Sequence, residues 1–126
     1  MEQNEKKKVA ILVVGYNEVA DYRQFKIAIL KSVNLNFVSK VYFVDKNKFT
    51  QQMERFCEDF KLEYEKLTPL PVKPSNEQAE KLSEVKALVV FNNGEDKRIK
   101  KYEAFVKKMP VYINNWKLKD NVLINK

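Results

Sequence analysis

The sequence predicts a single α/β domain, built on a parallel sheet of roughly five strands with helices on both faces. Three observations lead to this fold class. Strand-length apolar runs alternate with segments whose apolar residues recur at helical spacing. The strand-like runs are continuously apolar, as in strands buried on both faces. The length of 126 residues suits one domain. The alternating order predicts right-handed crossovers, with a charged tail at 1–7, the domain at 8–113 and an extension at 114–126.

The first half of the chain predicts three strands and two helices. Residues 8–14 form an apolar run that stops at Gly15 and predict the first strand, and residues 40–44 predict the second. Residues 62–67 are shorter and more polar, which indicates an edge strand. Two helices lie between these runs, and their predicted apolar faces are Tyr22, Phe25, Ile29, Leu30 and Val33 in the first and Phe49, Met53, Phe56, Cys57 and Phe60 in the second.

The second half begins with a proline-rich connection at 68–74, which cannot continue a ladder or a helix. Ser75 is the expected N-cap of a short helix whose apolar residues are Ala79, Leu82 and Val85. A buried strand at 87–91, a turn at 92–94, a helix at 99–109 and a strand at 111–113 follow. The extension is apolar enough to pack back on the domain, to add a strand or to contact a partner.

Composition excludes several classes of protein. The apolar runs are too short to cross a bilayer, and the charged start of the chain does not resemble a secretory signal, so we expect a cytoplasmic protein. Cys57 is the only cysteine and there is no histidine, which excludes an intrachain disulfide and a Cys/His zinc site. We expect Cys57 to be a buried packing residue, and we expect neither a metal nor a cofactor. Without histidine, proton transfer would fall to Asp, Glu, Lys, Tyr or Cys, which favours a non-catalytic protein.

A ligand of an open α/β sheet binds at the carboxyl ends of the strands. The residues there form the predicted ligand site: Gly15, Tyr16, Asn17, Asp45, Lys46, Asn47, Lys48, Asn92, Asn93 and Gly94. The chain has only two glycines, so neither a G-x-G-x-x-G loop nor a Walker loop can be present. A phosphoacceptor site would need paired acids after the first strand, where Gly15 and Tyr16 stand instead.

Two stretches carry a family resemblance. The segment Gly15-Tyr-Asn-Glu-Val-Ala-Asp-Tyr22 keeps the glycine, aspartate and tyrosine of a motif that reads roughly G-S-R-x-F-x-D-Y. Residues 85–94 are similar to a second motif, roughly A-D-A-L-I-A-F-W-D-G. On these residues the chain resembles the YspA-like branch of the SLOG superfamily, whose Rossmann-like domains are related to the DNA-processing protein DprA. The resemblance covers most of 8–113 and implies a nucleotide-handling ancestry.

The chain departs from that family at the phosphate loop. The family's S-G-G-A-x-G-A-D loop should fall at residues 43–50, which contain no glycine. The arginine-asparagine pair expected before the third helix is reduced to Ser75-Asn76. The resemblance therefore implies a scaffold with a degenerate nucleotide-binding loop.

Charge and two aromatic residues supply the remaining signals. The net charge is +7, and a basic stripe of the last helix comprises Lys97, Arg98, Lys100, Lys101, Lys107 and Lys108. This stripe is either a solvated face or a surface for nucleic acid or a partner. Tyr16 either contacts a ligand or fills space left by the lost glycines. Trp116 either anchors an interface or packs inside a folded-back tail.

The leading hypothesis is a non-catalytic SLOG-like domain that acts by binding another macromolecule, with a protein as the expected partner, as a regulator, adaptor or inhibitor. Such a role would fit a phage or mobile-element protein. The alternative is binding of a nucleotide or nucleotide-derived signal at the strand ends, with Lys46 and Lys48 as phosphate partners. A second alternative is weak nucleic-acid binding through the basic stripe at 97–108.

Overall fold

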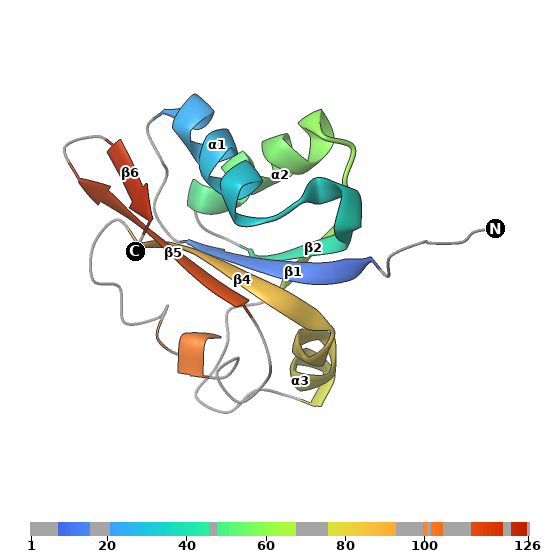
Figure 1. Ribbon diagram of the computed structural model, residues 1–126. Coiled ribbons are helices and arrows are strands. Elements are labelled where there is room, and N and C mark those ends of the chain that lie inside the picture. Colours follow the sequence, from blue (N-terminus) through green and yellow to red (C-terminus); the bar gives the residue numbers. More distant parts are fainter. Residues whose placement is uncertain are drawn as a thin grey trace.

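The computed structural model describes residues 8–15, 21–45, 48–67, 76–92, 100, 102–104, 112–119 and 122–125. These residues form one sheet with strand order β3-β2-β1-β4-β5-β6 (Figure 1). Neighbouring strands from β3 to β5 pair in parallel, and β6 is antiparallel to β5. The strands are β1 (Val9–Gly15), β2 (Val38–Val44), β3 (Tyr64–Leu67), β4 (Val85–Asn92), β5 (Tyr112–Lys119) and β6 (Val122–Asn125). The predicted α/β class with an open parallel sheet is confirmed.

Helices lie on both sides of this sheet. Figure 1 shows α1 and α2 over one face and α3 over the other. A 3₁₀ turn, η1, precedes β2 and covers Leu35–Phe37. The helices are α1 (Tyr22–Ser32), α2 (Lys48–Asp59) and α3 (Asn76–Ser83). No helix among the described residues is long and apolar enough to cross a membrane.

The central strands bury both of their faces, which explains their continuous apolar runs. In β1, Ile11 and Val13 join the core beneath α1 and α2, while Leu12 and Val14 join the core on the α3 side. Successive side chains of a strand point to opposite faces, so one run of residues supplies both cores. The predicted edge position of the polar strand is confirmed, because β3 is the outermost strand on its side.

Three side chains depart from the predicted helix faces. Leu30 is 44% exposed, because the core face of α1 is made by Phe25, Ala28 and Ile29. Phe60 lies beyond the end of α2, where the chain turns, and is 37% exposed. Val85 is not helical but begins β4 and is fully buried.

The C-terminal part of the chain continues the sheet. β5 extends from Tyr112 through the first six residues of the predicted extension to Lys119, and β6 follows it as an antiparallel edge strand. The extension therefore packs back and adds a strand. Several predicted elements fall outside the described residues, namely the tail at 1–7, the connection at 68–74, the cap at Ser75, and most of the turn at 92–94 and of the helix at 99–109.

Candidate functional site

The winding of the sheet changes direction between β1 and β4. β2 and β3 lie on one side of β1, whereas β4 and β5 lie on the other. Ligands of doubly wound sheets bind in the crevice at the carboxyl ends of the two strands that flank such a point. Gly15 is the register partner of Phe91 there, and Asn92 ends β4. The other predicted residues of these two strand ends, Tyr16, Asn17, Asn93 and Gly94, lie outside the described residues.

Gly15 lies directly against a phenyl ring. A Cβ atom built on Gly15 would come within 2.7 Å of Cδ1 and Cε1 of Phe49 and 3.0 Å of its Cγ. Real Cβ atoms do not approach other atoms this closely, and Phe49 is only 1% exposed. The φ angle of Gly15 is not positive, so this position needs glycine for its small size and not for its backbone freedom.

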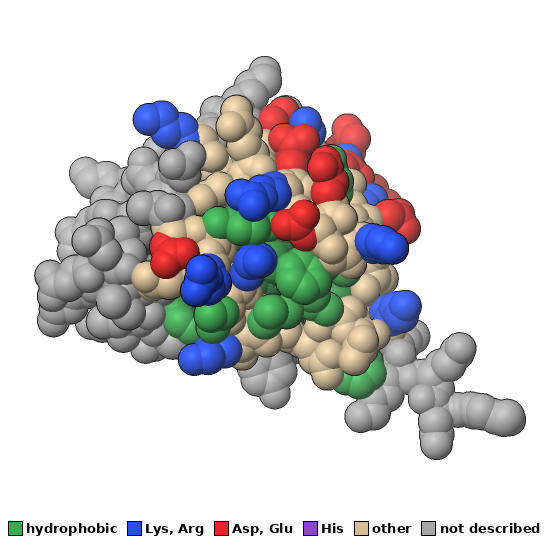
Figure 2. Space-filling view, turned by 90° about the horizontal axis from the view of Figure 1, so that it is seen from above, with side chains coloured by type: hydrophobic (Ala, Val, Ile, Leu, Met, Phe, Trp, Pro, Cys, Tyr) green, Lys and Arg blue, Asp and Glu red, His purple; other side chains and the backbone are tan. Residues whose placement is uncertain are grey.

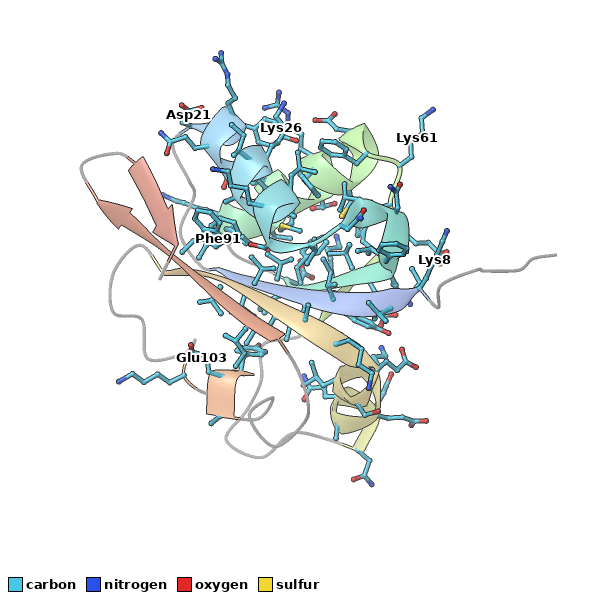
Figure 3. The ribbon with its side chains drawn as sticks, in the orientation of Figure 1. Lys8, Asp21, Lys26, Lys61, Phe91 and Glu103 are labelled. Carbon is cyan, nitrogen blue, oxygen red and sulfur yellow. The ribbon has the colours of Figure 1, made fainter. Side chains whose placement is uncertain are left out.

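The ring of Phe49 belongs to an aromatic cluster that fills the α1/α2 side of this strand end. Its centroid lies 5.3 Å from that of Phe25, in an edge-to-face contact, and 5.4 Å from that of Phe91. Phe25 and Phe91 are 5.0 Å apart. Figure 3 shows Phe91 between the sheet and the helices above it. Aromatic rings therefore occupy the space next to the Gly15 backbone on this side of the sheet.

Hydrogen bonds tie down the carboxyl end of β2. The Thr50 hydroxyl donates to the carbonyl oxygen of Val44 at 2.7 Å, and the Asp45 backbone N–H donates to that of Leu67 at 2.8 Å. Asp45 is half-buried, and Lys48 is exposed at the first position of α2. Because Phe49 touches Gly15, the start of α2 lies against the end of β1. Lys46 and Asn47 lie outside the described residues.

Trp116, a predicted partner-binding residue, lies in the core and is only 5% exposed. Its Nε1–H donates to the Ser32 hydroxyl at 2.8 Å, and that hydroxyl donates to the carbonyl oxygen of Ala28 at 2.8 Å. The indole thus joins β5 to the end of α1, which is the folded-back alternative. It is not available as a surface anchor.

Only part of the predicted basic stripe is described. Lys100 is exposed, while Tyr102 is 2% exposed, as expected for opposite sides of an amphipathic helix. Lys97, Arg98 and Lys101 lie outside the described residues, so their role as a nucleic-acid or partner surface stays a prediction.

The pKa shifts of Cys57 and Glu65 are explained by burial and by ion pairs in the fold. Burial raises the pKa of the Cys57 thiol to about 12, and neighbouring Glu58 and Glu54 add to this shift. Hydrogen bonds from Lys81 and Lys40 hold the pKa of the Glu65 carboxyl below its usual value, and they join the edge strand β3 to β2 and α3. Within the described ranges, no three Cys, Asp or Glu side chains gather as metal ligands.

The sequence reasoning missed one surface. Arg23, Ile27, Leu30 and Lys31 form an exposed stripe along α1. The signal was present in the sequence, because these positions are spaced i, i+4, i+7 and i+8 and therefore share one side of a helix.

No protein-family model, curated protein or solved structure matches this chain.

Proposed function

We propose that this protein is a non-catalytic SLOG-like domain of three-layer, Rossmann-like architecture that acts by binding another protein. The contact between Gly15 and Phe49 carries the proposal. In nucleotide-binding domains with this strand order, a glycine after the first strand lets a phosphate approach the backbone and the N-terminus of a helix. Here a phenyl ring lies against the same glycine.

The chemistry around the described end of β1 supports the same conclusion. A bound phosphate needs N–H donors or cations, and transfer of its charge into an apolar site is costly without them. Phe25, Phe49 and Phe91 supply aromatic carbon instead. Thr50 is the one buried polar side chain found among the described residues, and its hydroxyl already donates to the Val44 carbonyl.

The outer face of the α1/α2 layer favours binding to a macromolecule. Ile27 and Leu30 expose nearly half of their surface on one side of α1, next to basic side chains. Contiguous exposed apolar surface with a polar border is typical of protein interaction sites. The protein would then act as a regulator, adaptor or inhibitor through its surface rather than through its strand ends.

Calorimetric titration of the intact protein with ATP, NAD and a cyclic dinucleotide tests the proposal. We expect no saturable heat up to millimolar ligand, a limit that corresponds to about 4 kcal/mol of binding free energy. Lys48→Ala provides the site variant and Lys86→Ala the matched control, since both lysines are exposed. Saturable heat that is lost in Lys48→Ala and kept in Lys86→Ala would overturn the proposal in favour of a nucleotide site.

A further inference from the structure

The outward stripe of α1 is apolar at its centre and basic at its ends. Ile27 and Leu30 are 45% and 44% exposed, and both Arg23 and Lys31 are exposed. Figure 2, which views the α1/α2 face, shows hydrophobic side chains lying between Lys and Arg side chains. Isolated exposed apolar residues are common, but these two lie one turn apart on the same side of a helix.

A hollow continues this stripe where α1 ends. It has a volume of about 470 Å³ and is lined by residues 30–36. Leu30 and Lys31 belong to both the stripe and the hollow, while Val33 and Leu35 add apolar surface to it. In protein interfaces, a few side chains that fill pockets on the partner contribute most of the binding free energy, so the hollow is a place where such a side chain could bind.

The charge that α1 itself contributes to this surface is basic, while Asp59 of α2 lies beside it and accepts the Tyr22 hydroxyl hydrogen at 2.7 Å. α1 contains no acidic residue from Tyr22 to Ser32, and Asp21 before it is the N-cap, whose carboxylate accepts the Arg23 backbone N–H at 2.9 Å. Lys26 borders the stripe on its other flank, with its Nζ 5.0 Å from the centroid of the Tyr22 ring. Figure 3 shows Lys26 on the outer side of α1, and Figure 2 shows acidic side chains gathered at another part of this face.

We infer that this surface, Arg23, Ile27, Leu30, Lys31 and the hollow at 30–36, docks an acidic amphipathic segment of a partner protein. The inference rests on the proposed function and names the surface and the class of partner. An amphipathic segment supplies apolar side chains for Ile27, Leu30 and the hollow, and its carboxylates lie opposite Arg23 and Lys31.

The geometry favours this partner over two other anionic ones. A nucleic-acid backbone would meet the basic residues but would leave Ile27 and Leu30 without an apolar counterpart. A membrane-surface helix inserts a wide apolar face, commonly with Trp, Phe and Leu, into the bilayer. α1 exposes two large apolar side chains, Ile27 and Leu30, which form a narrower face than such insertion needs.

Selection from a phage-displayed peptide library on the folded, full-length protein tests the inference. The charge variant is Arg23→Glu/Lys31→Glu, and its matched control is Lys8→Glu/Lys86→Glu, which changes the net charge by the same amount at exposed positions elsewhere. The apolar variant is Ile27→Ser/Leu30→Ser, and its control is Phe60→Ser, which alters another exposed hydrophobic residue. Far-UV circular dichroism establishes that every variant is folded.

We expect the selected peptides to carry net negative charge and apolar residues at helical spacing. Their affinity, measured as synthetic peptides by fluorescence anisotropy, should fall about tenfold or more in both stripe variants, change little in both controls and weaken as salt is raised.

Peptides that bind but are neutral or basic, or that bind the stripe variants as tightly as the wild type, would overturn the inference while leaving a protein-binding function intact. Failure to enrich any peptide, together with saturable nucleotide heat in calorimetry, would overturn the proposed function as well. If no peptide is enriched and no saturable nucleotide heat is observed, only the inference of an acidic-segment partner would be overturned. Tight binding of duplex DNA or of anionic phospholipid vesicles that the stripe variants abolish would assign the surface to a different anion.

Discussion

The substitution Gly15→Ala probes the contact on which the proposed function depends. The new methyl group would overlap the Phe49 ring, with its nearest ring atoms at 2.7 Å. Phe49 cannot turn away at little cost, because Phe25 and Phe91 pack against the same ring. Overpacking of this kind costs about 1–3 kcal/mol. Replacing glycine also stabilises a protein by roughly 0.4–1 kcal/mol through the unfolded chain. We therefore expect a net loss of about 1–2 kcal/mol in the free energy of unfolding.

Urea denaturation monitored by the fluorescence of the single, buried Trp116 measures this loss. The companion variant Phe49→Leu removes the ring and leaves a cavity, so it should destabilise the protein by itself. In the double variant Gly15→Ala/Phe49→Leu, the leucine makes room for the methyl group. Its loss of stability should therefore be about 1 kcal/mol smaller than the sum of the losses in the two single variants. A loss below about 0.5 kcal/mol for Gly15→Ala, or strictly additive costs, would refute the packing explanation of Gly15.

Three further predictions concern other parts of the structure. Trp116→Phe removes the donor to Ser32 and should cost about 1–3 kcal/mol in urea denaturation followed by circular dichroism, whereas adding Ser32→Ala to it should cost little more; fully additive costs would contradict the hydrogen bond. The Cys57 thiol, buried and with its pKa raised to about 12, should react with a thiol-specific disulfide reagent at neutral pH only after unfolding, and rapid labelling of the folded protein would contradict its burial. The Glu65 carboxyl has a folded-state pKa below its ordinary value of 4.5, so the stability it contributes is present above that pH and is lost as the pH falls through the lowered pKa. Glu65→Gln should therefore flatten the loss of stability below pH ~4.5, by at most about 1 kcal/mol for this partly exposed pair, and an unchanged acid limb would contradict the lowered pKa.

The sequence predicted the sheet well where each strand is buried on both faces. The run that includes Leu12 and Val13 has no polar position, and such a run fits few structures other than a central parallel strand. The edge position of β3 was also predictable, because its side chains are more polar. Cys57 followed the same logic, since it is spaced with Met53 and Phe56 and is buried with them.

Helix faces were predicted less reliably, because small residues compete with large ones for the core. Ala28 faces the sheet in α1 and leaves Leu30 on the outer side, although leucine is the more hydrophobic of the two. The role of Trp116 could not be settled from the sequence either. It is buried in contact with Ser32, to which its Nε1–H donates, and Ser32 lies 84 residues away in the chain.

The position of the strand-end site was predictable from the topology of the sheet. Which group lies next to Gly15 depends instead on a tertiary contact. A glycine after a strand has the same appearance in a sequence whether it approaches a phosphate or a phenyl ring. The ring comes from Phe49, which the spacing of α2 identified only as a core residue. Which of the two neighbours Gly15 has is decided by how α2 packs on the sheet.

Nuclear magnetic resonance titration of the isotope-labelled protein follows both surfaces in one experiment, because each backbone amide gives its own signal. With nucleotides up to millimolar concentration, we expect the amide signals of Gly15 and Phe91 to stay in place. With an acidic amphipathic peptide, we expect saturable shifts at residues 23–36. Saturable shifts of the Gly15 and Phe91 signals with a nucleotide, while the signals of α1 stay in place with the peptide, would show that the strand ends and not α1 form the binding surface.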